Sequence, residues 1–394
     1  MSKRRFFLKL LKMMSNFFVS FDQMIKIKDT ILSVPDFQNP PQEQNIMKYP
    51  TMMDIIKSVL GEKQFNEPKD ADKVTMPLDF MLERGNYMVC RADFHPQGQF
   101  LYPCSKTMNM LFRGQNHYYS NCFSSFFRLK TEKEKLLAHL HQAEFIQLLN
   151  SHPVVKYLKS HTFTRDGLPG TLIVPIDEEG LAQHYGIPTE VVDFSNDLWV
   201  SAFFATAKYD NQAQTYSPYL VNESYSLSDL YGVLYFREGV IGEIYSRPIG
   251  SNYFNRPGVQ SGFAYKSQIR NLNEDGNFSK IYFRHDNDDS NYIFKQLDCG
   301  KTLFPSDSLV DITNRINTQE RCSIAAVKLS HLLWYTKLSF NAFLVLLESQ
   351  GIQVCEVSPV KFDDFLLKEE YALWLDKKRF DFLENIYCIP ICKF

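Results

Sequence analysis

The sequence has no apolar run that approaches the roughly 20 residues needed to cross a membrane. Its formal net charge is only −2, so no excess of positive charge indicates nucleic-acid binding. It also contains no internal repeat and no low-complexity tract. These absences favour an ordinary globular protein without a transmembrane segment, and we expect it to be cytoplasmic.

Metal-binding cysteine patterns are missing as well. None of the eight cysteines has CxxC spacing, and no nearby histidine completes a zinc-like set. Free buried thiols in a reducing cytosol explain the cysteines better than a metal site or a reactive thiol does. We therefore expect no bound metal.

Aromatic side chains are in excess, with 33 Phe and 21 Tyr. Because these residues bury large areas, we expect a dense aromatic core or several aromatic-lined clefts. A chain of 394 residues is also long enough for two or three structural units.

The start of the chain is basic and amphipathic. It opens like a signal peptide, but Lys9 and Lys12 interrupt the apolar stretch and no small-residue cleavage site follows. A helix is predicted over residues 1–34. Residues 1–25 are expected either to pack on their own domain or to contact a partner or a membrane surface.

Helix and strand patterns alternate irregularly along the rest of the chain. Thr131 and Glu134 fit a capping box that starts a helix running to about Asn150. Ser195 is expected to cap a helix that continues through Ala205. Strands are predicted at 108–112, 232–237, 259–265, 280–284 and 352–357, and further helices at 51–62, 329–335 and 339–350. Because these elements do not form regular βαβ units, we predict an α+β fold with mixed or antiparallel sheets and peripheral helices.

The first candidate site follows the apolar strand at 108–112. A guanidinium fixed at a strand end, as at Arg113, can hold a diphosphate or a carboxylate with two hydrogen bonds. Gly114 would let a ligand approach the backbone. An arginine after a strand usually forms a structural ion pair, but here further donors, rings, hydroxyls and a second cation follow, namely Gln115, Asn116, His117, Tyr118, Tyr119, Ser124, Ser125 and Arg128. This grouping favours a ligand site.

The second candidate site is the segment 181–189 together with Asp193. Gly186 and Pro188 force a turn after a short helix, and turns display side chains that helix interiors hide. His184 lies at the C-terminus of that helix, where the dipole favours its protonated form. Asp193 has two open interpretations, which are orienting His184 and capping the next helix.

At these residues the sequence resembles the FRG-domain family of bacterial proteins. Phe112-Arg113-Gly114-Gln115 matches the signature Phe-Arg-Gly-Gln, and Leu181–Thr189 matches the block Leu-Ala-Gln-His-Tyr-Gly-Leu-Pro-Thr except at Ile187. Further similar motifs follow in the family's order at 124–128, 193–195, 201–205, Arg256 with 260–263, and 303–306. Several ordered motifs are specific, whereas a lone Arg-Gly-Gln would mean little.

The resemblance covers roughly residues 80–316. It divides the chain into an N-terminal helical extension and linker at 1–75, an FRG domain at 76–316 and a C-terminal helical or mixed extension at 317–394. Two residues depart from the family pattern, Phe194 where tryptophan is usual and Glu190 where arginine is common. Glu190 reverses the local charge, so ligand specificity near that turn stays open.

The Arg-Gly strand end, the Ser-Ser segment and the aromatic residues are also similar to ADP-ribosyltransferases of the Arg-Ser-Glu type. This similarity implies an ADP-ribosyltransferase-like core, NAD as the substrate, and a protein or nucleic-acid acceptor. The usual setting of the family implies a toxin or a phage-defence effector.

Roles for individual residues follow from the same similarity. Arg113 would grip NAD, a tyrosine would stack on it, His184 would contact a ribose or the adenosine side, and Gln260 or Asp193 would orient the acceptor. The implied catalytic residues are Arg113, His184, Asp193 and Gln260. The implied NAD-binding residues are Arg113, Gly114, Gln115, Tyr118, Ser124, Ser125, Arg128, Gln183, Tyr185 and Thr189, with Tyr119 as a further stacking candidate.

The catalytic carboxylate is unassigned, because no Glu-x-Glu or Gln-x-Glu lies near Gln260. A second interpretation is therefore a module that senses a nucleotide or a phosphorylated ligand without turnover. A nuclease is disfavoured, since the acidic run at Asp286, Asp288 and Asp289 lacks the glycine of a calcium loop and is interpreted as a solvated hairpin tip.

Overall fold

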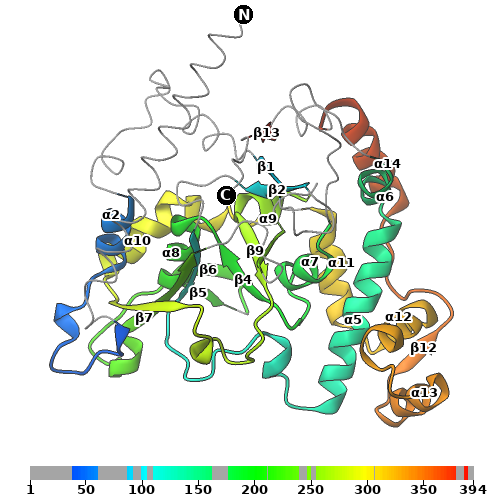
Figure 1. Ribbon diagram of the computed structural model, residues 1–394, viewed down its shortest axis with the longest axis horizontal. Coiled ribbons are helices and arrows are strands. Elements are labelled where there is room, and N and C mark those ends of the chain that lie inside the picture. The colour runs from blue at the N-terminus through cyan, green and yellow to red at the C-terminus, as the bar shows by residue number, and fades with distance from the viewer. Residues whose placement is uncertain are drawn as a thin grey trace, which may run out of the picture.

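The computed structural model describes residues 38–60, 87–91, 99–103, 110–161, 176–210, 212–238, 246–249, 254–305, 307–378 and 386–388 (Figure 1). The helix predicted over 1–34, and with it the contact expected of residues 1–25, lies outside these ranges. None of the helices that the structure describes is long and apolar enough to cross a membrane.

A six-stranded sheet forms the centre of the fold, and every described pairing in it is antiparallel. Its strands, in spatial order, are β10 (Ser279–Arg284), β7 (Tyr231–Glu238), β3 (Met110–Gln115), β4 (Val192–Ser195), β9 (Gly262–Tyr265) and β8 (Ser246–Pro248). The long strands β7 and β10 confirm the strands predicted at 232–237 and 280–284. Helices around an antiparallel sheet confirm the α+β class.

Three smaller sheets accompany the central one. They consist of β1 (Tyr87–Arg91) between β2 (Gln99–Pro103) and β13 (Ile386–Cys388), of β5 (Ala207–Asp210) with β6 (Thr215–Pro218), and of β11 (Arg321–Ser323) with β12 (Gln353–Cys355). The pairs β1–β13 and β11–β12 are parallel. The described sheets are therefore mixed in direction, as predicted, although the central one is antiparallel.

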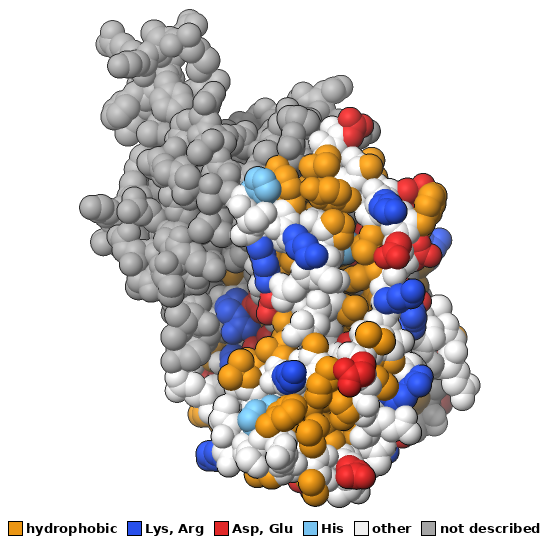
Figure 2. Space-filling view, turned by 90° about the vertical axis from the view of Figure 1, so that its right-hand side faces the viewer, with side chains coloured by type: hydrophobic (Ala, Val, Ile, Leu, Met, Phe, Trp, Pro, Cys, Tyr) orange, Lys and Arg blue, Asp and Glu red, His pale blue; other side chains and the backbone are white. Residues whose placement is uncertain are grey.

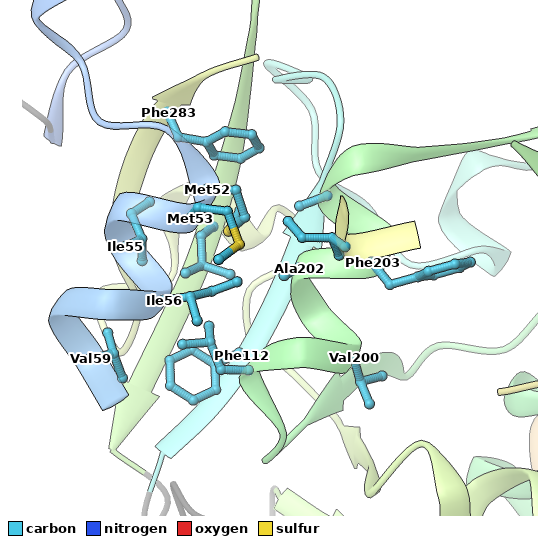
Figure 3. Close-up of a cluster of buried hydrophobic side chains, with 14 of the residues drawn as sticks. Met52, Met53, Ile55, Ile56, Val59, Phe112, Val200, Ala202, Phe203 and Phe283 are labelled. Atoms are coloured by element: carbon cyan, nitrogen blue, oxygen red, sulfur yellow. The ribbon is translucent and has the colours of Figure 1, made fainter. Parts of the chain in front are cut away.

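Alternating side chains of β3 divide the core into two parts. Phe112 belongs to the helix-covered core, where α2 (Met52–Leu60) and α8 (Leu198–Thr206) bury their apolar side chains against the sheet (Figure 3). Leu111 points to the opposite face, into a tyrosine-rich core that includes Tyr231, Tyr235, Tyr265 and Tyr282. Successive residues of a strand face opposite sides of a sheet, so Arg113 shares the face of Leu111.

Gly114 is required by the packing of α8 on β3. A Cβ atom at this position would lie 1.9 Å from the backbone oxygen of Ser201 and 2.7 Å from the Cβ of Ala205. The helix thus crosses the strand at a distance that only glycine permits. This close approach accounts for the glycine without a ligand.

The helix α5 (Glu132–Ser151) connects the central sheet to the C-terminal part of the chain. It begins at the predicted capping box of Thr131 and Glu134, which is confirmed. Around it lie α6 (Pro153–Ser160), α11 (Ser308–Asn317), α12 (Ile324–Trp334), α13 (Phe340–Ser349) and α14 (Asp364–Leu373). Figure 2 shows this side of the molecule, where hydrophobic side chains lie among charged ones and the exposed apolar residues include Leu332, Val345, Val357 and Phe365.

Several predicted boundaries were wrong. Strand β3 does not end before Arg113 but continues to Gln115, because its pairing with β7 extends to Val233. Ser195 does not cap α8: it pairs with Gly262 at the end of β4, and Asp197 accepts the capping hydrogen bond from the Trp199 N–H.

Two further corrections concern the second half of the chain. The strand predicted at 259–265 begins only at Gly262, after the short helix α9 (Asn255–Val259). Asp286 does not lie at a hairpin tip but caps α10 (Asn287–Gln296) by accepting hydrogen bonds from the N–H groups of Asp288 and Asp289.

Candidate functional site

Arg113 lies where β3 and β4 stop pairing. The described register of these two strands contains one residue pair, Phe112 with Ser195. Immediately beyond it, Nη1 of Arg113 donates a hydrogen bond of 2.8 Å to the backbone oxygen of Asp193. Nε of Arg113 is buried and has no hydrogen-bond partner in the part of the chain that the structure describes. The guanidinium is thus positioned by one backbone bond and keeps donors for a ligand.

Asp193 brings the two predicted sites together. Its Oδ1 lies 3.5 Å from Nδ1 of His184, and its Oδ2 accepts a hydrogen bond of 3.1 Å from Nε2 of Gln183. The His184 side chain is 5% exposed and the Asp193 side chain 31% exposed, so the histidine is covered while the carboxylate reaches solvent. Nε2 of His184 and Oδ1 of Asp193 are buried atoms, and no described residue forms a hydrogen bond with either of them. Of the two interpretations of Asp193, the structure agrees with the position beside His184 and not with a helix cap.

Gln183 and His184 owe their positions to α7 (Glu178–His184), which starts at the cap Asp177. The helix ends as predicted at a turn in which Gly186 has a φ of +88°. Such a backbone conformation favours glycine. The turn sends the chain back into β4, so that Asp193 lies beside the last turn of the helix that precedes it.

Gln183 joins the Ser-Ser segment to the same group. Its Oε1 accepts hydrogen bonds from Ser125 Oγ (2.6 Å) and Thr189 Oγ1 (2.9 Å), while its Nε2 donates to Asp193. Ser125 Oγ also accepts from the Thr189 N–H at 2.9 Å. Ser125, Gln183 and Thr189 therefore bond one another, and in this structure their role is to position Asp193.

Arg128 adds a second positive charge. The pKa of its guanidinium is lowered by partial burial and by the charge of Arg113, and it is raised by Asp193 among other groups. The like charge of Arg113 thus disfavours the charge of Arg128, and an anion bound between them would relieve that repulsion.

The charge of Glu190, the departure from the family pattern, is compensated within the protein. Its Oε2 lies 3.2 Å from Nζ of Lys266, which also pairs with Glu179 at 3.3 Å. Because this ion pair is partly exposed, it contributes little to stability. It does keep the negative charge of Glu190 directed at Lys266.

Other predicted residues have contacts elsewhere. Tyr185 is buried, and its hydroxyl donates a short hydrogen bond to Asp307. Tyr118 packs edge-on against Tyr282, with ring centroids 5.3 Å apart. Of the three tyrosines predicted to stack on NAD, Tyr119 is the one whose side chain is exposed, at 52%.

Three polar residues of the predicted set also face the protein. Nε2 of Gln115 lies 3.5 Å from the sulfur of Cys122. Ser124 is buried, and its Oγ has no hydrogen-bond partner within the described ranges. Gln260 is buried, and its Nε2 donates to the backbone oxygen of Leu303 at 2.7 Å, so it holds a neighbouring loop rather than contacting Arg113 or Asp193.

One residue near the site was absent from the predicted set. The guanidinium of Arg256 lies over the rings of Tyr185 and Phe304. Its sequence signal was its place in the Arg…Gln-x-Gly-Phe motif, but nothing in the local sequence shows which rings it would meet.

Comparison with protein families gives a match for part of the chain. Residues 108–214 match the family model described as the FRG domain. The chain carries an FRG domain. The matched stretch runs from β3 through β5, so it contains both Arg113 and the Gln183–Asp193 group, while β7, β9 and β10 of the same sheet follow it in sequence. Comparison with curated proteins and with solved structures gave no match. Among the residues that the structure describes, no group of three or more His, Cys, Asp or Glu side chains could hold a metal ion.

Proposed function

We propose that the FRG domain binds NAD at Arg113 and Arg128 and acts as an ADP-ribosyltransferase-like enzyme. The observation that carries this proposal is that Arg113 donates to the Asp193 backbone while the Asp193 carboxylate lies beside His184. Each of these three residues has a buried polar atom without a hydrogen-bond partner among the residues that the structure describes. Buried polar groups in native proteins are nearly always satisfied, so several exceptions at one place point to a ligand. The diphosphate of NAD fits the two guanidinium groups.

The chemistry assigns Asp193 the role that the sequence left open. In ADP-ribosyl transfer the bond between C1′ of the ribose and the nicotinamide nitrogen breaks, nicotinamide leaves, and the acceptor forms a new bond to C1′ and loses a proton. Positive charge develops on the ribose in the transition state, and a fixed carboxylate stabilises it. Asp193 is partly exposed and held by Gln183, so it supplies that charge. His184 contacts a ribose or the adenosine side.

A second function, binding NAD or another nucleotide without turnover, is favoured by one observation. Oδ2 of Asp193 already accepts a hydrogen bond from Gln183 Nε2, and Oδ1 lies 3.5 Å from His184 Nδ1. Among the described residues no second carboxylate contacts Asp193 or Arg113. A carboxylate engaged in this way can serve as a fixed acceptor for a ligand hydroxyl. In that case the domain is a sensor of the nucleotide.

Nicotinamide release from NAD, followed by chromatography together with NAD binding by calorimetry, separates the two functions. Arg113→Gln is expected to weaken NAD binding about 10- to 100-fold through loss of charge-assisted hydrogen bonds. Asp193→Asn is expected to bind NAD within a few-fold of the wild type and to release nicotinamide about 100-fold more slowly. Arg315→Gln is the matched control, because Arg315 lies on the exposed surface of α11 and pairs with Asp311.

The outcomes are distinct. Binding without release in the wild-type protein, with proteins and nucleic acids offered as acceptors, would establish the sensor. Absence of NAD binding would overturn the enzyme, and absence of binding to NAD, ATP and GTP alike would overturn the sensor as well. A role as a toxin or phage-defence effector is part of the proposal as well. It predicts that induced expression arrests bacterial growth, and that Asp193→Asn relieves the arrest at equal protein level.

A further inference from the structure

Among the residues that the structure describes, none accepts a hydrogen bond from the guanidinium of Arg256 on α9. Its Cζ lies 5.1 Å from the ring centroid of Tyr185 and 5.6 Å from that of Phe304. Its Nε is buried without a hydrogen-bond partner, and its side chain forms no hydrogen bond or ion pair with any residue that the structure describes. A partly buried cation without an acceptor is costly, and stacking on rings offsets only part of that cost.

The carboxylate that would be expected to neutralise Arg256 is engaged elsewhere. Asp307 accepts a hydrogen bond from the Tyr185 hydroxyl and caps α11 by accepting from the Leu309 N–H at 3.0 Å. Burial raises the pKa of Asp307, although the Tyr185 hydrogen bond and the charge of Arg256 oppose this rise. The charge of Arg256 thus acts on Asp307, but no hydrogen bond or ion pair joins the two side chains.

Arg256 belongs to the same neighbourhood as Asp193. Tyr216 stacks on Phe304 with ring centroids 4.9 Å apart and planes inclined by 13°. Burial raises the pKa of Tyr216 to about 12, and the charges of Arg256 and Asp193 act on it in opposite directions. Tyr216 therefore lies within electrostatic reach of both.

The backbone supports this proximity through Gln260, which follows α9. Ser195 Oγ donates to the Gln260 backbone oxygen at 2.8 Å, and Gln260 Nε2 donates to Leu303, the residue before Phe304. These two bonds tie the end of α9 and the Phe304 loop to the strand that carries Asp193. The position of Arg256 relative to that strand is thereby fixed.

We infer that Arg256 is a second anion-binding subsite of the FRG domain, separate from Arg113 and Arg128, and that it takes a phosphate group. This inference rests on the proposed function in so far as it extends that site. A guanidinium already stacked on two rings is restricted in orientation and presents its Nη donors in a planar fork, which matches two phosphate oxygens. The Tyr216–Phe304 pair forms an apolar wall beside it. The phosphate belongs either to the bound dinucleotide or to the acceptor.

Calorimetric titration of the full chain with inorganic pyrophosphate at low salt tests the subsite, in the free protein and in protein saturated with NAD. Substitution of both Arg113 and Arg128 by Gln removes the first anion site, so the remaining pyrophosphate binding in that double variant reports on Arg256. We expect Arg256→Gln in this background to weaken the remaining binding at least tenfold. Arg315→Gln in the same background is expected to leave it unchanged. Arg256→Lys, which keeps the charge but loses the fork, is expected to weaken it a few-fold and serves if the glutamine variant does not fold.

Titration of the NAD-saturated protein with pyrophosphate identifies which molecule supplies the phosphate. Pyrophosphate that still binds there in an Arg256-dependent manner marks the subsite as one for the acceptor, and displacement by NAD marks it as one for the dinucleotide. Equal pyrophosphate binding with and without the Arg256 substitutions would overturn the subsite. Failure of the wild type to bind NAD, with Arg256-dependent pyrophosphate binding retained, would overturn the proposed function alone.

Discussion

His139 of α5 and Trp334 of α12 stack with ring centroids 4.4 Å apart and planes inclined by only 3°. The opposite face of His139 stacks on Phe126, also at 4.4 Å, and its Nδ1 lies 2.9 Å from the Tyr335 hydroxyl. Phe126 directly follows Ser125, which bonds Gln183. One buried histidine thus links the helices of the C-terminal part to the segment that positions Asp193.

Removing the Trp334 ring, the outer member of this stack, should destabilise both α12 and the segment at Phe126. Trp334→Ala is expected to lower the free energy of unfolding by about 1–3 kcal/mol, since it removes a large, partly exposed aromatic contact. Hydrogen exchange should rise in α12 and at the Phe126 N–H, which donates to the Thr189 backbone oxygen at 3.0 Å. Leu332→Ala on the same helix is the control, because Leu332 is 67% exposed and should change stability by less than about 0.5 kcal/mol. Unchanged exchange at Phe126 in the Trp334 variant would contradict the link.

Stability should fall as the pH drops below about 6.5. Burial, with a smaller contribution from Lys266, lowers the pKa of His139 to about 4, and burial likewise lowers that of His285 to about 4. The unfolded chain, with a histidine pKa near 6.5, binds more protons than the folded one between these values, so the stabilisation present above pH 6.5 is lost as the pH falls toward 4. Each group contributes roughly 2 kcal/mol of loss between pH 7.5 and pH 5.

His139→Phe separates this titration from the stacking. Phenylalanine keeps a ring between Phe126 and Trp334 but cannot bind a proton, so urea unfolding should show a shallower pH dependence than in the wild type. The contribution of His285 remains in the variant. The same pH dependence in both proteins would show that His139 is not the titrating group.

Gly114→Ala tests whether that glycine serves packing or a ligand. The added methyl group would meet the backbone of Ser201 at 1.9 Å, so α8 must move, and we expect a loss of about 1–3 kcal/mol or more in the free energy of unfolding. Gly276→Ala is the matched control, because a Cβ there meets no atom within 4 Å. Should Gly114→Ala keep its stability but lose NAD binding, the glycine would serve the approach of a ligand after all.

The sequence correctly predicted those helix ends that are determined by residues close to them in the chain. The capping box at Thr131 and the turn at Gly186 depend on neighbouring residues, and both were predicted correctly. Ser195 and Asp197 are both good capping residues, and the choice between them was made by the pairing of Ser195 with Gly262 on β9, which lies far along the chain. The end of β3 was likewise decided by a partner strand, β7.

The same division applies to the candidate site. The motifs predicted the positions of Arg113 and His184, and the structure brings Asp193 beside both. The motifs could not show that Tyr185 is buried under Arg256, because that contact requires α7, α9 and the Phe304 loop to pack together. Nor could they show that Gln260 bonds the backbone of Leu303. Long-range packing, which leaves no local pattern, determined these contacts.

The hydrogen bond between Gln183 and Asp193 can be reversed by exchanging donor and acceptor. Gln183→Glu keeps the acceptor for Ser125 and Thr189 but removes the donor to Asp193 Oδ2 and adds a like charge, so we expect a loss of about 1–3 kcal/mol near neutral pH. Repulsion raises the pKa of such a carboxyl pair in the folded protein, and the loss should therefore shrink as the pH falls and a proton joins the pair. The double variant Gln183→Glu with Asp193→Asn restores a donor and an acceptor in the opposite order.

Urea unfolding of the wild type, both single variants and the double variant gives the coupling energy of the pair. We expect the double variant to regain most of the stability that Gln183→Glu loses. It should nevertheless release nicotinamide as slowly as Asp193→Asn, because the negative charge has moved from β4 to α7 and no longer stands at position 193. A double variant no more stable than Gln183→Glu would show that the two side chains are not coupled. Recovered turnover in that variant would show that the carboxylate need not stand at position 193.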